Sequence, residues 1–390
     1  MSDSITQDAL RERAEKLVAP LRERAGEAEE LRQLPAATLA DFEAAEILQA
    51  MRPAAVGGLE IDLQTYVDVT RTIARGDASA GWLAGFYMSY GWVFSKLETA
   101  AQDEIFNGRP WAVAAGTLSQ PGEATSVEGG LRITGRWRFA SGILDAQWIV
   151  LMALSEDGPM ICVVPVSEVT IHDTWHVPGM KATGSNDVEA QDVFVPSRRA
   201  VPVDLIVSPD NPGSREFDYP LLRYPVQQVA ALIHPAVALG VADAALELFR
   251  ESIESRMRVQ TFGAVIEEPL IHQVYGEAVN LRRCAELRLR DAVEMADAGF
   301  GGEGLGLSVE DRAHLNLAIS SAADLAFATV DLLIRNAGAS IHRTGKALDR
   351  ICRDTQVMRN HVIIDWRYTT TICGRVLLGQ GLGDQLEALF

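Results

Sequence analysis

Cysteines and long apolar runs are scarce in this sequence of 390 residues, and each scarcity excludes a class of protein. The four cysteines, Cys162, Cys284, Cys352 and Cys373, form no CxxC pair. Their wide spacing favours reduced thiols over a disulfide framework or a cysteine-rich zinc site. No uninterrupted apolar run approaches the roughly 18 residues that cross a bilayer. The amino-terminal segment is polar, without a signal-peptide core. We therefore expect a soluble, cytoplasmic protein.

Basic residues are also few. The sequence has 35 Lys and Arg against 53 Asp and Glu, which gives a formal net charge of −18. An acidic protein repels nucleic-acid phosphates and anionic lipids unless it carries a local basic stripe. The basic residues form only scattered pairs such as Arg282 and Arg283. Neither nucleic acid nor a membrane is an expected partner.

The hydrophobic share of 48% and the charged share of 23% are those of an ordinary globular protein. Residues 1–115 show helical spacing, and Pro20 is expected to break or kink the first helix. Asp62 is a candidate cap for one later helix, and Asp77 or Ser79 for the next. That next segment, AGWLAGFYMSYGWVF, is apolar on nearly every side, which predicts that it is buried or lines a pocket.

The rest of the chain divides into two further zones. Residues 116–215 contain short β-rich runs separated by Gly, Pro, Asp and Asn, which predicts a compact antiparallel sheet or barrel. Residues 216–390 return to long helical patterns and predict a four-helix bundle. The expected fold class is therefore α+β, mostly α, with an N-terminal helical domain, a central β domain and a C-terminal bundle.

Five segments then point to a known family. They are residues 51–62 (MRPAAVGGLEID), 76–85 (GDASAGWLAG), 129–142 (GGLRITGRWRFASG), 173–196 (DTWHVPGMKATGSNDVEAQDVFVP) and 352–361 (CRDTQVMRNH). In this order they resemble the acyl-CoA dehydrogenase superfamily over nearly the whole chain. The best match within it is the two-component flavin-dependent monooxygenases, such as the oxygenase component of p-hydroxyphenylacetate hydroxylase. The resemblance implies that superfamily's fold and a homotetramer.

The chemistry of the residues helps to choose between a dehydrogenase and an oxygenase. An acyl-CoA dehydrogenase or oxidase acting on a thioester needs a carboxylate base over the substrate. In the similar dehydrogenases a glutamate often follows the C-terminal Arg-Asp pair, but here Arg353 and Asp354 lead to His361 and to no glutamate. The other family position falls within residues 219–242, which contain no carboxylate. The sequence favours the oxygenase, with the thioester enzyme as the alternative.

His361 is the first candidate catalytic residue. An oxygenase must stabilise and protonate the negative charge that develops on oxygen, and an imidazole that can carry a proton near neutral pH suits this task. Similar monooxygenases place a histidine in this region, and the resemblance implies the same role for His361. The alternative is a core histidine hydrogen-bonded to Asp365 one helical turn on.

Ser141, in the segment FASG, is the second candidate. A strand is expected to end there in a Gly-containing turn, and the resemblance implies that this serine approaches N5 of the flavin. The alternative is a turn serine that satisfies its own backbone. Trp82, Phe86 and Tyr90 recur at i, i+4 and i+8 and share one helix face. They are candidates for a wall over flavin and substrate, although such stripes are also typical of a simple core.

Three polar residues complete the candidate site. Thr117 and Ser119 are possible pocket contacts or ordinary turn residues. Arg258 resembles the flavin-phosphate arginine of the superfamily, and otherwise reads as a solvated helix arginine. Similar phenol hydroxylases tend to carry a histidine near the position of Tyr90, so this departure weakens the case for a phenol substrate.

The implied cofactor is reduced flavin, FMNH2 or FADH2, which reacts with O2 through a flavin hydroperoxide to oxygenate an aromatic or heteroaromatic small molecule. No GxGxxG motif follows a predicted strand, which is consistent with reduced flavin arriving from a separate flavin reductase. His172 and His176 have metal-like spacing, but Asp173 is the one potential ligand beside them, so no metal site is expected.

Overall fold

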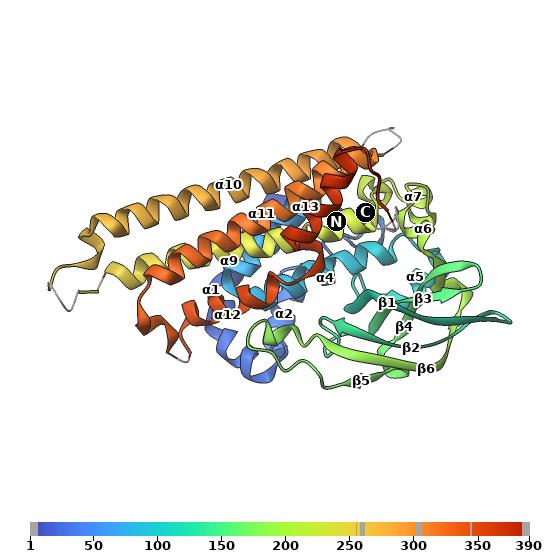
Figure 1. The fold of residues 1–390 in the computed structure, drawn as a ribbon. Helices are drawn as coiled ribbons and strands as arrows, with labels where there is room; N and C mark the ends of the chain where they lie inside the picture. Colours follow the sequence, from blue (N-terminus) through green and yellow to red (C-terminus); the bar gives the residue numbers. More distant parts are fainter. Residues whose placement is uncertain (1–6, 255, 258–261, 302–305, 344, 384–390) are drawn as a thin grey trace.

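The computed structural model describes residues 7–254, 256–257, 262–301, 306–343 and 345–383. Its three parts follow the predicted order of helices, sheet and helical bundle (Figure 1). The first part contains α1 (Gln7–Leu31), α2 (Ala36–Ala44), α3 (Leu63–Gly76), α4 (Ala78–Phe94) and α5 (Thr99–Phe106). The sheet and its short following helices come next, and the long helices of the bundle form the opposite side of the molecule.

Two predicted helix caps are confirmed in the first part. Asp62 accepts a hydrogen bond from the Thr65 N–H at 2.7 Å, and Asp77 accepts one from the Ala80 N–H at 2.8 Å. The predicted break at Pro20 is wrong, because α1 continues through this residue. The apolar side of α1, which includes Leu17 and Leu21, is buried and packs against α3. This packing outweighs the backbone hydrogen bond that proline cannot make.

Helix α4 lies between the sheet and the bundle (Figure 1). It packs against α3, against α9 of the bundle and against strand β1. Nearly all of its residues are buried, as the sequence predicts for a helix that is apolar on every side. Because one helix contacts all three parts, its side chains can meet residues that are distant in sequence.

The seven strands form one sheet in the order β5-β6-β2-β1-β3-β4-β7. Their bounds are β1 (Ala114–Val127), β2 (Gly130–Ala140), β3 (Trp148–Ser155), β4 (Gly158–Pro165), β5 (Thr170–His172), β6 (Asn186–Pro196) and β7 (Ala200–Pro202). The predicted antiparallel arrangement holds for every pair except β1 and β3, which are parallel. After the hairpin at Gly129 (φ 83°), the chain crosses from the end of β2 to the free side of β1, so β3 repeats the direction of β1.

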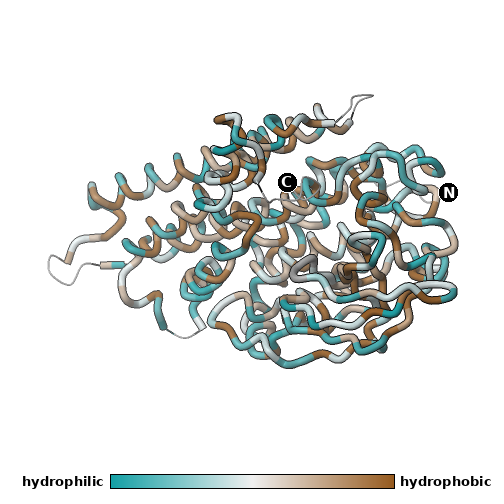
Figure 2. The backbone as a smooth tube through the Cα atoms, turned by 45° about the vertical axis from the view of Figure 1, so that its right-hand side comes forward, coloured by the Kyte–Doolittle hydropathy of each residue, from teal (hydrophilic) through white to brown (hydrophobic). Residues whose placement is uncertain are grey.

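Short helices connect the sheet to the bundle: α6 (Val203–Val207), α7 (Pro212–Glu216) and α8 (Val226–Ala231). The bundle consists of α9 (Ile233–Glu254), α10 (Pro269–Phe300), α11 (Val309–Asn336), α12 (Ala347–Met358) and α13 (Trp366–Leu377). The predicted fourth helix is therefore divided into α12 and α13. Hydrophobic and hydrophilic residues alternate along the long helices (Figure 2), as amphipathic bundle helices require.

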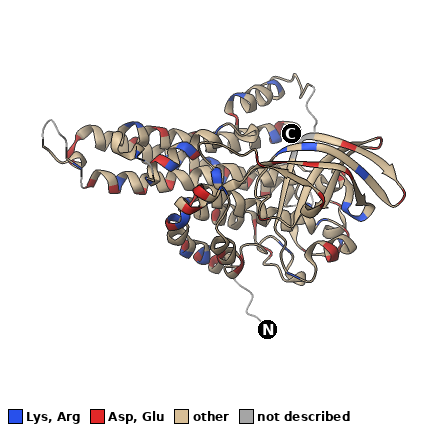
Figure 3. Cartoon of the chain, turned by 90° about the horizontal axis from the view of Figure 1, so that it is seen from below, with Lys and Arg blue, Asp and Glu red and all other residues tan. Residues whose placement is uncertain are grey.

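Two stretches of the bundle are long and apolar enough to cross a membrane by length and composition, residues 226–254 and α11. Most of the first stretch is buried inside the fold, as is about half of α11, and core helices of bundles have this composition. Charges of both signs are interspersed along the helices (Figure 3). Arg71 of α3, for example, pairs with Asp243 of α9 at 2.7 Å and Glu286 of α10 at 3.0 Å.

Candidate active site

The indole of Trp82, on α4, contacts two imidazoles that come from different helices of the bundle. Its ring centroid lies 4.9 Å from that of His234 and 5.4 Å from that of His361, both in edge-on arrangements. The two imidazoles lie 4.2 Å apart with their planes tilted by 33°. The indole N–H of Trp82 is buried and has no hydrogen-bond partner among the described residues. The three rings thus form a cluster in which Trp82 and His234 are buried and His361 is partly exposed.

His234 is the residue of this cluster that the sequence analysis missed. It lies in the first turn of α9, just after the break between α8 and α9, and is almost completely buried. Its Nδ1 lies 3.1 Å from the Ala231 carbonyl oxygen. A carbonyl can only accept, so Nδ1 carries the proton and Nε2 is an acceptor. That Nε2 has no partner in the described part of the chain. The sequence signal was a histidine-proline pair inside an otherwise apolar segment.

His361 lies in the break that divides the fourth helix of the bundle. It follows α12 and caps the short 3-10 helix Val362–Ile364, where its Nδ1 accepts a hydrogen bond from the Ile363 N–H at 3.4 Å. The alternative hydrogen bond between His361 and Asp365 is not among the contacts of the described residues, in which the Asp365 carboxylate accepts from the Tyr368 N–H at the start of α13. With Nδ1 as the acceptor, the neutral ring of His361 carries its proton on Nε2.

Burial keeps both imidazoles neutral. It lowers the pKa of His361 to about 4. Burial, and next the neighbouring His361, lower the pKa of His234 well below its ordinary range. In the protein alone, His361 is therefore neutral near neutral pH, and the role of proton carrier expected from the sequence requires that its pKa be raised. The pair presents one Nε2–H donor on His361 and one bare Nε2 acceptor on His234, so it can serve a polar group without being charged.

The aromatic stripe of α4 forms a continuous ladder beside the histidines. Ring centroids are 5.8 Å apart for Trp82 and Phe86, and 6.2 Å apart for Phe86 and Tyr90. Phe86 also meets His234 edge-on at 6.2 Å. The hydroxyl end of Tyr90 packs against the backbone of Gly116 in β1. The structure therefore brings the three predicted wall residues together with both imidazoles.

The other predicted polar residues have mixed placements. Thr117 is buried in β1, next to the glycine that Tyr90 contacts. Ser119 also lies in β1, but its side chain is outside the described part of the structure, as is the whole of Arg258. His172 and His176 have separate partners: His172 pairs with Glu189 at 2.8 Å, and His176 lies beside Arg32 and Asp173.

Ser141 lies in the turn that follows β2, and this turn contacts α4. Phe139, near the end of β2, has a left-handed backbone (φ 64°), which is uncommon for a residue with a side chain. The Tyr87 hydroxyl of α4 donates to the Gly142 carbonyl at 3.3 Å and so attaches this turn to the helix. The Ser141 Oγ lies 2.8 Å from the Oγ of Ser185, a buried residue of the loop before β6.

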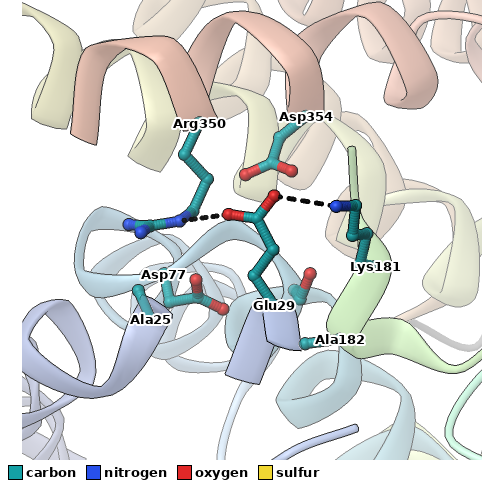
Figure 4. A pocket seen from close by; sticks show the side chains of 8 residues that line it. Ala25, Glu29, Asp77, Lys181, Ala182, Arg350 and Asp354 are labelled. Carbon is teal, nitrogen blue, oxygen red and sulfur yellow. Dashed lines mark hydrogen bonds and ion pairs between the residues drawn. The ribbon is translucent and has the colours of Figure 1, made fainter. Parts of the chain in front are cut away.

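A cluster of charges holds the loop that carries Ser185 (Figure 4). Glu29 of α1 accepts from Arg350 of α12 and from Lys181 of the loop, at 3.3 Å and 3.2 Å. Asp354 of α12 accepts a hydrogen bond from the Met180 N–H at 2.5 Å. These contacts join the first helix, the sheet and the bundle at the base of the Ser141 turn.

The residues present fit a flat, polar heterocycle such as flavin. The indole N–H of Trp82 and Nε2 of His234 are buried and unpaired in the described structure, and buried polar atoms are normally hydrogen-bonded. Ser141 is partly exposed and presents a hydroxyl. Aromatic walls with a few placed polar groups are the usual lining of cofactor and substrate pockets.

Comparison with known proteins identifies the family of the chain. Residues 3–106 match the acyl-CoA dehydrogenase N-terminal domain family, and residues 232–366 match the acyl-CoA dehydrogenase C-terminal domain family. A pigment production hydroxylase of Rhodococcus sp. (strain ATCC 21145) is 31% identical, over 98% of this chain and 99% of its own. The oxygenase component of an FADH2-dependent resorcinol hydroxylase from Rhizobium sp. (strain MTP-10005) is 27% identical, over 92% and 91%.

Two further matches bear on the resemblance noted from the sequence. The p-hydroxyphenylacetate 3-hydroxylase oxygenase component of Acinetobacter baumannii is 25% identical, over 94% of this chain and 88% of its own. The structure of XiaF from Streptomyces sp., in complex with FADH2 and glycerol, superposes with a TM-score of 0.89 at 25% identity, over 97% of each chain. The chain therefore belongs to the acyl-CoA dehydrogenase superfamily and, within it, to the oxygenase components of two-component flavin-dependent monooxygenases.

Proposed function

We propose that this protein takes reduced flavin from a separate reductase and uses it with O2 to oxygenate an aromatic or heteroaromatic small molecule. The observation that carries the proposal is the pair of imidazoles against Trp82, in the region where a thioester dehydrogenase needs a carboxylate. Burial is the one cause that shifts the pKa of His361, and no carboxylate contributes to it. The names of the similar hydroxylases support the same reaction class.

Each residue has a defined task in this proposal. Reduced flavin, when bound, supplies the electrons that activate O2. Trp82, Phe86 and Tyr90 exclude water and form the apolar wall against which a flat substrate lies. His361 presents its Nε2–H to the negative charge that develops on oxygen, and Ser141 contacts the flavin N5.

The pKa of His361 depends on whether an anion is bound next to the ring. In the protein alone its pKa is lowered to about 4 because the ring is removed from water. A bound anion close to the ring favours the charged imidazolium and raises that pKa. Because reduced flavin is an anion near neutral pH, its binding would turn His361 into a proton carrier where one is needed. The like charge of a second imidazolium opposes double protonation of the pair.

The thioester dehydrogenase or oxidase is the alternative function. It would draw on a carboxylate, and Asp354 is a buried carboxylate near the end of the chain. Its Oδ1, however, accepts from the Met180 N–H, and it belongs to the charged cluster of Figure 4 rather than to the Trp82 cluster. The geometry therefore favours the oxygenase.

The test is anaerobic reduction of the protein with FMN or FAD, followed by mixing with O2 and an aromatic probe such as indole or resorcinol. We expect a transient absorbance distinct from both oxidised and reduced flavin, and one atom of labelled O2 in the product. Anaerobic bleaching of oxidised flavin by an acyl-CoA, without a transient after mixing with O2, would establish the alternative instead. The same assay with each flavin decides between FMN and FAD.

We also propose that the protein is a cytoplasmic homotetramer. Besides the family resemblance, large apolar side chains are exposed on and around α13, at Val362 (62% exposed), Tyr368 (43%) and Leu378 (77%). If these side chains form one contiguous patch, it would mark an interface. Light scattering of the purified protein should give four times the mass of the chain, and the charge-introducing variant Leu378→Glu should lower it.

A further inference from the structure

Three hydroxyl groups form a continuous chain behind the turn of Ser141. The Ser141 Oγ lies 2.8 Å from the Ser185 Oγ, and the Ser185 Oγ lies 2.7 Å from the Thr183 Oγ1. The chain ends where the Thr183 Oγ1 meets the Met180 carbonyl oxygen at 2.8 Å. Thr183 is 2% exposed and Ser185 is 4% exposed, so both are removed from water. Ser141 is the member that reaches solvent-accessible space.

The Met180 carbonyl at the end of this series of hydroxyls favours one direction for its hydrogen bonds. A carbonyl oxygen can only accept, so the hydroxyl of Thr183 donates its one proton to Met180. The Thr183 oxygen must then accept from Ser185, and the Ser185 oxygen must accept from Ser141. The Ser141 hydroxyl therefore donates its proton to Ser185, toward the interior of the protein. Its outward side carries lone pairs, which makes it a hydrogen-bond acceptor.

The surroundings hold this direction in place. The Met180 N–H donates to Asp354 and Lys181 pairs with Glu29, so both sides of the Met180 carbonyl are anchored. The Gly142 N–H donates to the Thr183 carbonyl at 2.8 Å, which fixes the Ser141 turn against the same loop. Reversal of the series would remove the bond from the Thr183 hydroxyl to the Met180 carbonyl, which would then keep the bond from the Trp175 indole N–H at 3.0 Å. A neutral hydrogen bond of this kind changes an equilibrium by about tenfold.

We propose that Thr183 and Ser185 are positioning residues that make Ser141 an acceptor, so that the site prefers reduced flavin to oxidised flavin. The inference rests on the proposed function, in which Ser141 contacts the flavin N5. In reduced flavin N5 carries a hydrogen and can donate to Ser141. In oxidised flavin N5 carries a lone pair, which meets the lone pairs of an acceptor. An enzyme that receives reduced flavin by diffusion needs this discrimination, because oxidised flavin competes for the same site.

The test measures dissociation constants of reduced and oxidised flavin, the reduced form under anaerobic conditions, for the full chain and its variants. We expect the wild-type protein to bind the reduced form about tenfold more tightly. By linkage, this raises the two-electron potential of the bound flavin by about 30 mV. In Thr183→Val, Ser185 loses its inward acceptor and donates to Ser141, which then donates outward. The ratio of the dissociation constant of oxidised flavin to that of reduced flavin should fall toward one or below one.

Three further variants separate the hydroxyl chain from other effects. Ser185→Ala frees the Ser141 hydroxyl to turn either way and should bring the ratio near one. Thr183→Ser keeps the hydroxyl and should keep the wild-type ratio. Thr329→Val is the matched control, because Thr329 is equally buried and donates to the Leu325 carbonyl within α11. It should leave the ratio unchanged.

The outcomes distinguish failure of this inference from failure of the proposed contact. If Ser141→Ala abolishes the preference while Thr183→Val and Ser185→Ala keep it, the flavin contact stands and the directing role of the chain is overturned. If Ser141→Ala also keeps the preference, the proposed contact itself is wrong. Should Thr183→Val fail to fold, Ser185→Ala alone decides, since an unchanged ratio in that variant contradicts the proposal.

Discussion

The imidazoles of His234 and His361 lie 4.2 Å apart, although one begins α9 and the other occupies the break between α12 and α13. Each ring is oriented by a single backbone contact: His234 donates to the Ala231 carbonyl, and His361 accepts from the Ile363 N–H. Because Nδ1 donates in His234 and accepts in His361, Nε2 of His234 is an acceptor and Nε2 of His361 is a donor. A helix start and a helix break, rather than a regular helical surface, therefore create the polar part of the site.

We predict that His234→Leu separates activity from stability. An unpaired buried polar atom costs about 1–3 kcal/mol, and the lost bond to Ala231 contributes about 1 kcal/mol in the other direction. The free energy of unfolding should thus stay equal to that of the wild type or rise by up to about 2 kcal/mol, while product formation falls by about tenfold or more. Chemical unfolding and product assays measure both. The exposed His314, replaced in the same way, is the control, and a large loss of stability with full activity would contradict the prediction.

The lowered pKa of His361 predicts how its removal changes stability with pH. The folded ring has a pKa of about 4, against about 6.5 in an unfolded chain, so between these values the unfolded state binds more protons. This contribution to stability is fully present above pH 6.5 and is lost as the pH falls toward 4. His361→Ala should flatten the dependence in that window by up to about 1.4 kcal/mol per pH unit.

Urea unfolding at several pH values between 4 and 7 measures this slope. The same variant should fold but lose most of the O2-dependent transient of the flavin, because the donor to the developing charge is absent. Equal slopes in wild type and variant would mean that His361 is not desolvated as described. An unchanged transient would remove His361 from the reaction.

Local sequence signals predicted the frame of this site well. The caps at Asp62 and Asp77 were readable because a side-chain oxygen that precedes an apolar run acts within one helical turn. The burial of α4 followed from its composition, and the family resemblance identified the fold. Pro20 was misread because its local cost is overcome by packing against α3, which no local pattern contains.

The parts that could not be predicted are those that depend on distant contacts. His234 reads as an ordinary core histidine until the fold places His361 beside it. The interruption of the fourth bundle helix, and with it the orientation of His361, requires the capping of α13 by Asp365. The direction of the Ser141 hydroxyl depends on Thr183, whose role becomes visible only when the two turns face each other.

We predict that Asp354 changes the stability with pH in the direction opposite to His361. Burial, and next the charge of Asp77, raise the pKa of this carboxyl to about 7. The folded protein then holds a proton that the unfolded chain releases near pH 4, so the stabilisation is present below pH 4 and is lost as the pH rises through 7. Asp354→Asn keeps an oxygen for the Met180 N–H. It should therefore match the wild type near pH 4 and be more stable at pH 8, with a slope difference of up to about 1.4 kcal/mol per pH unit.

Denaturant unfolding of both proteins at pH 4, 6 and 8 tests this expectation. Glu29 provides the contrast, because hydrogen bonds with Arg353 and Lys181 overcome its burial and lower its pKa to about 2. Glu29→Gln should lose stability at neutral pH rather than gain it. A loss of stability in Asp354→Asn at pH 8 would show that the ionised carboxylate, and not its burial, dominates the cluster.

The contact of Tyr90 with Gly116 predicts a defect that a second substitution repairs. A Cβ at Gly116 would lie 2.3 Å from the Tyr90 hydroxyl oxygen and 2.8 Å from the carbon that bears it. Tyr90 is held by ring contacts with Phe86 and Phe94, so it cannot move without disturbing the aromatic ladder. Gly116→Ala should cost about 1–3 kcal/mol of stability, as overpacking of a core does, and should raise KM for an aromatic substrate.

Removal of the Tyr90 hydroxyl takes away the nearest atom in that contact, so Tyr90→Phe should restore part of the loss in the Gly116→Ala protein. Tyr90→Phe alone should change stability little but should change KM if the hydroxyl faces the substrate. Gly276→Ala is the control, because a Cβ there meets nothing within 4 Å on α10 and a helical alanine is favoured over glycine. Thermal melts and Michaelis kinetics of the four proteins form a double-mutant cycle. If the effects of the two substitutions on stability and KM simply add, the Tyr90 side chain and position 116 do not interact. If the effects are coupled, the contact with strand β1 positions Tyr90 in the aromatic wall.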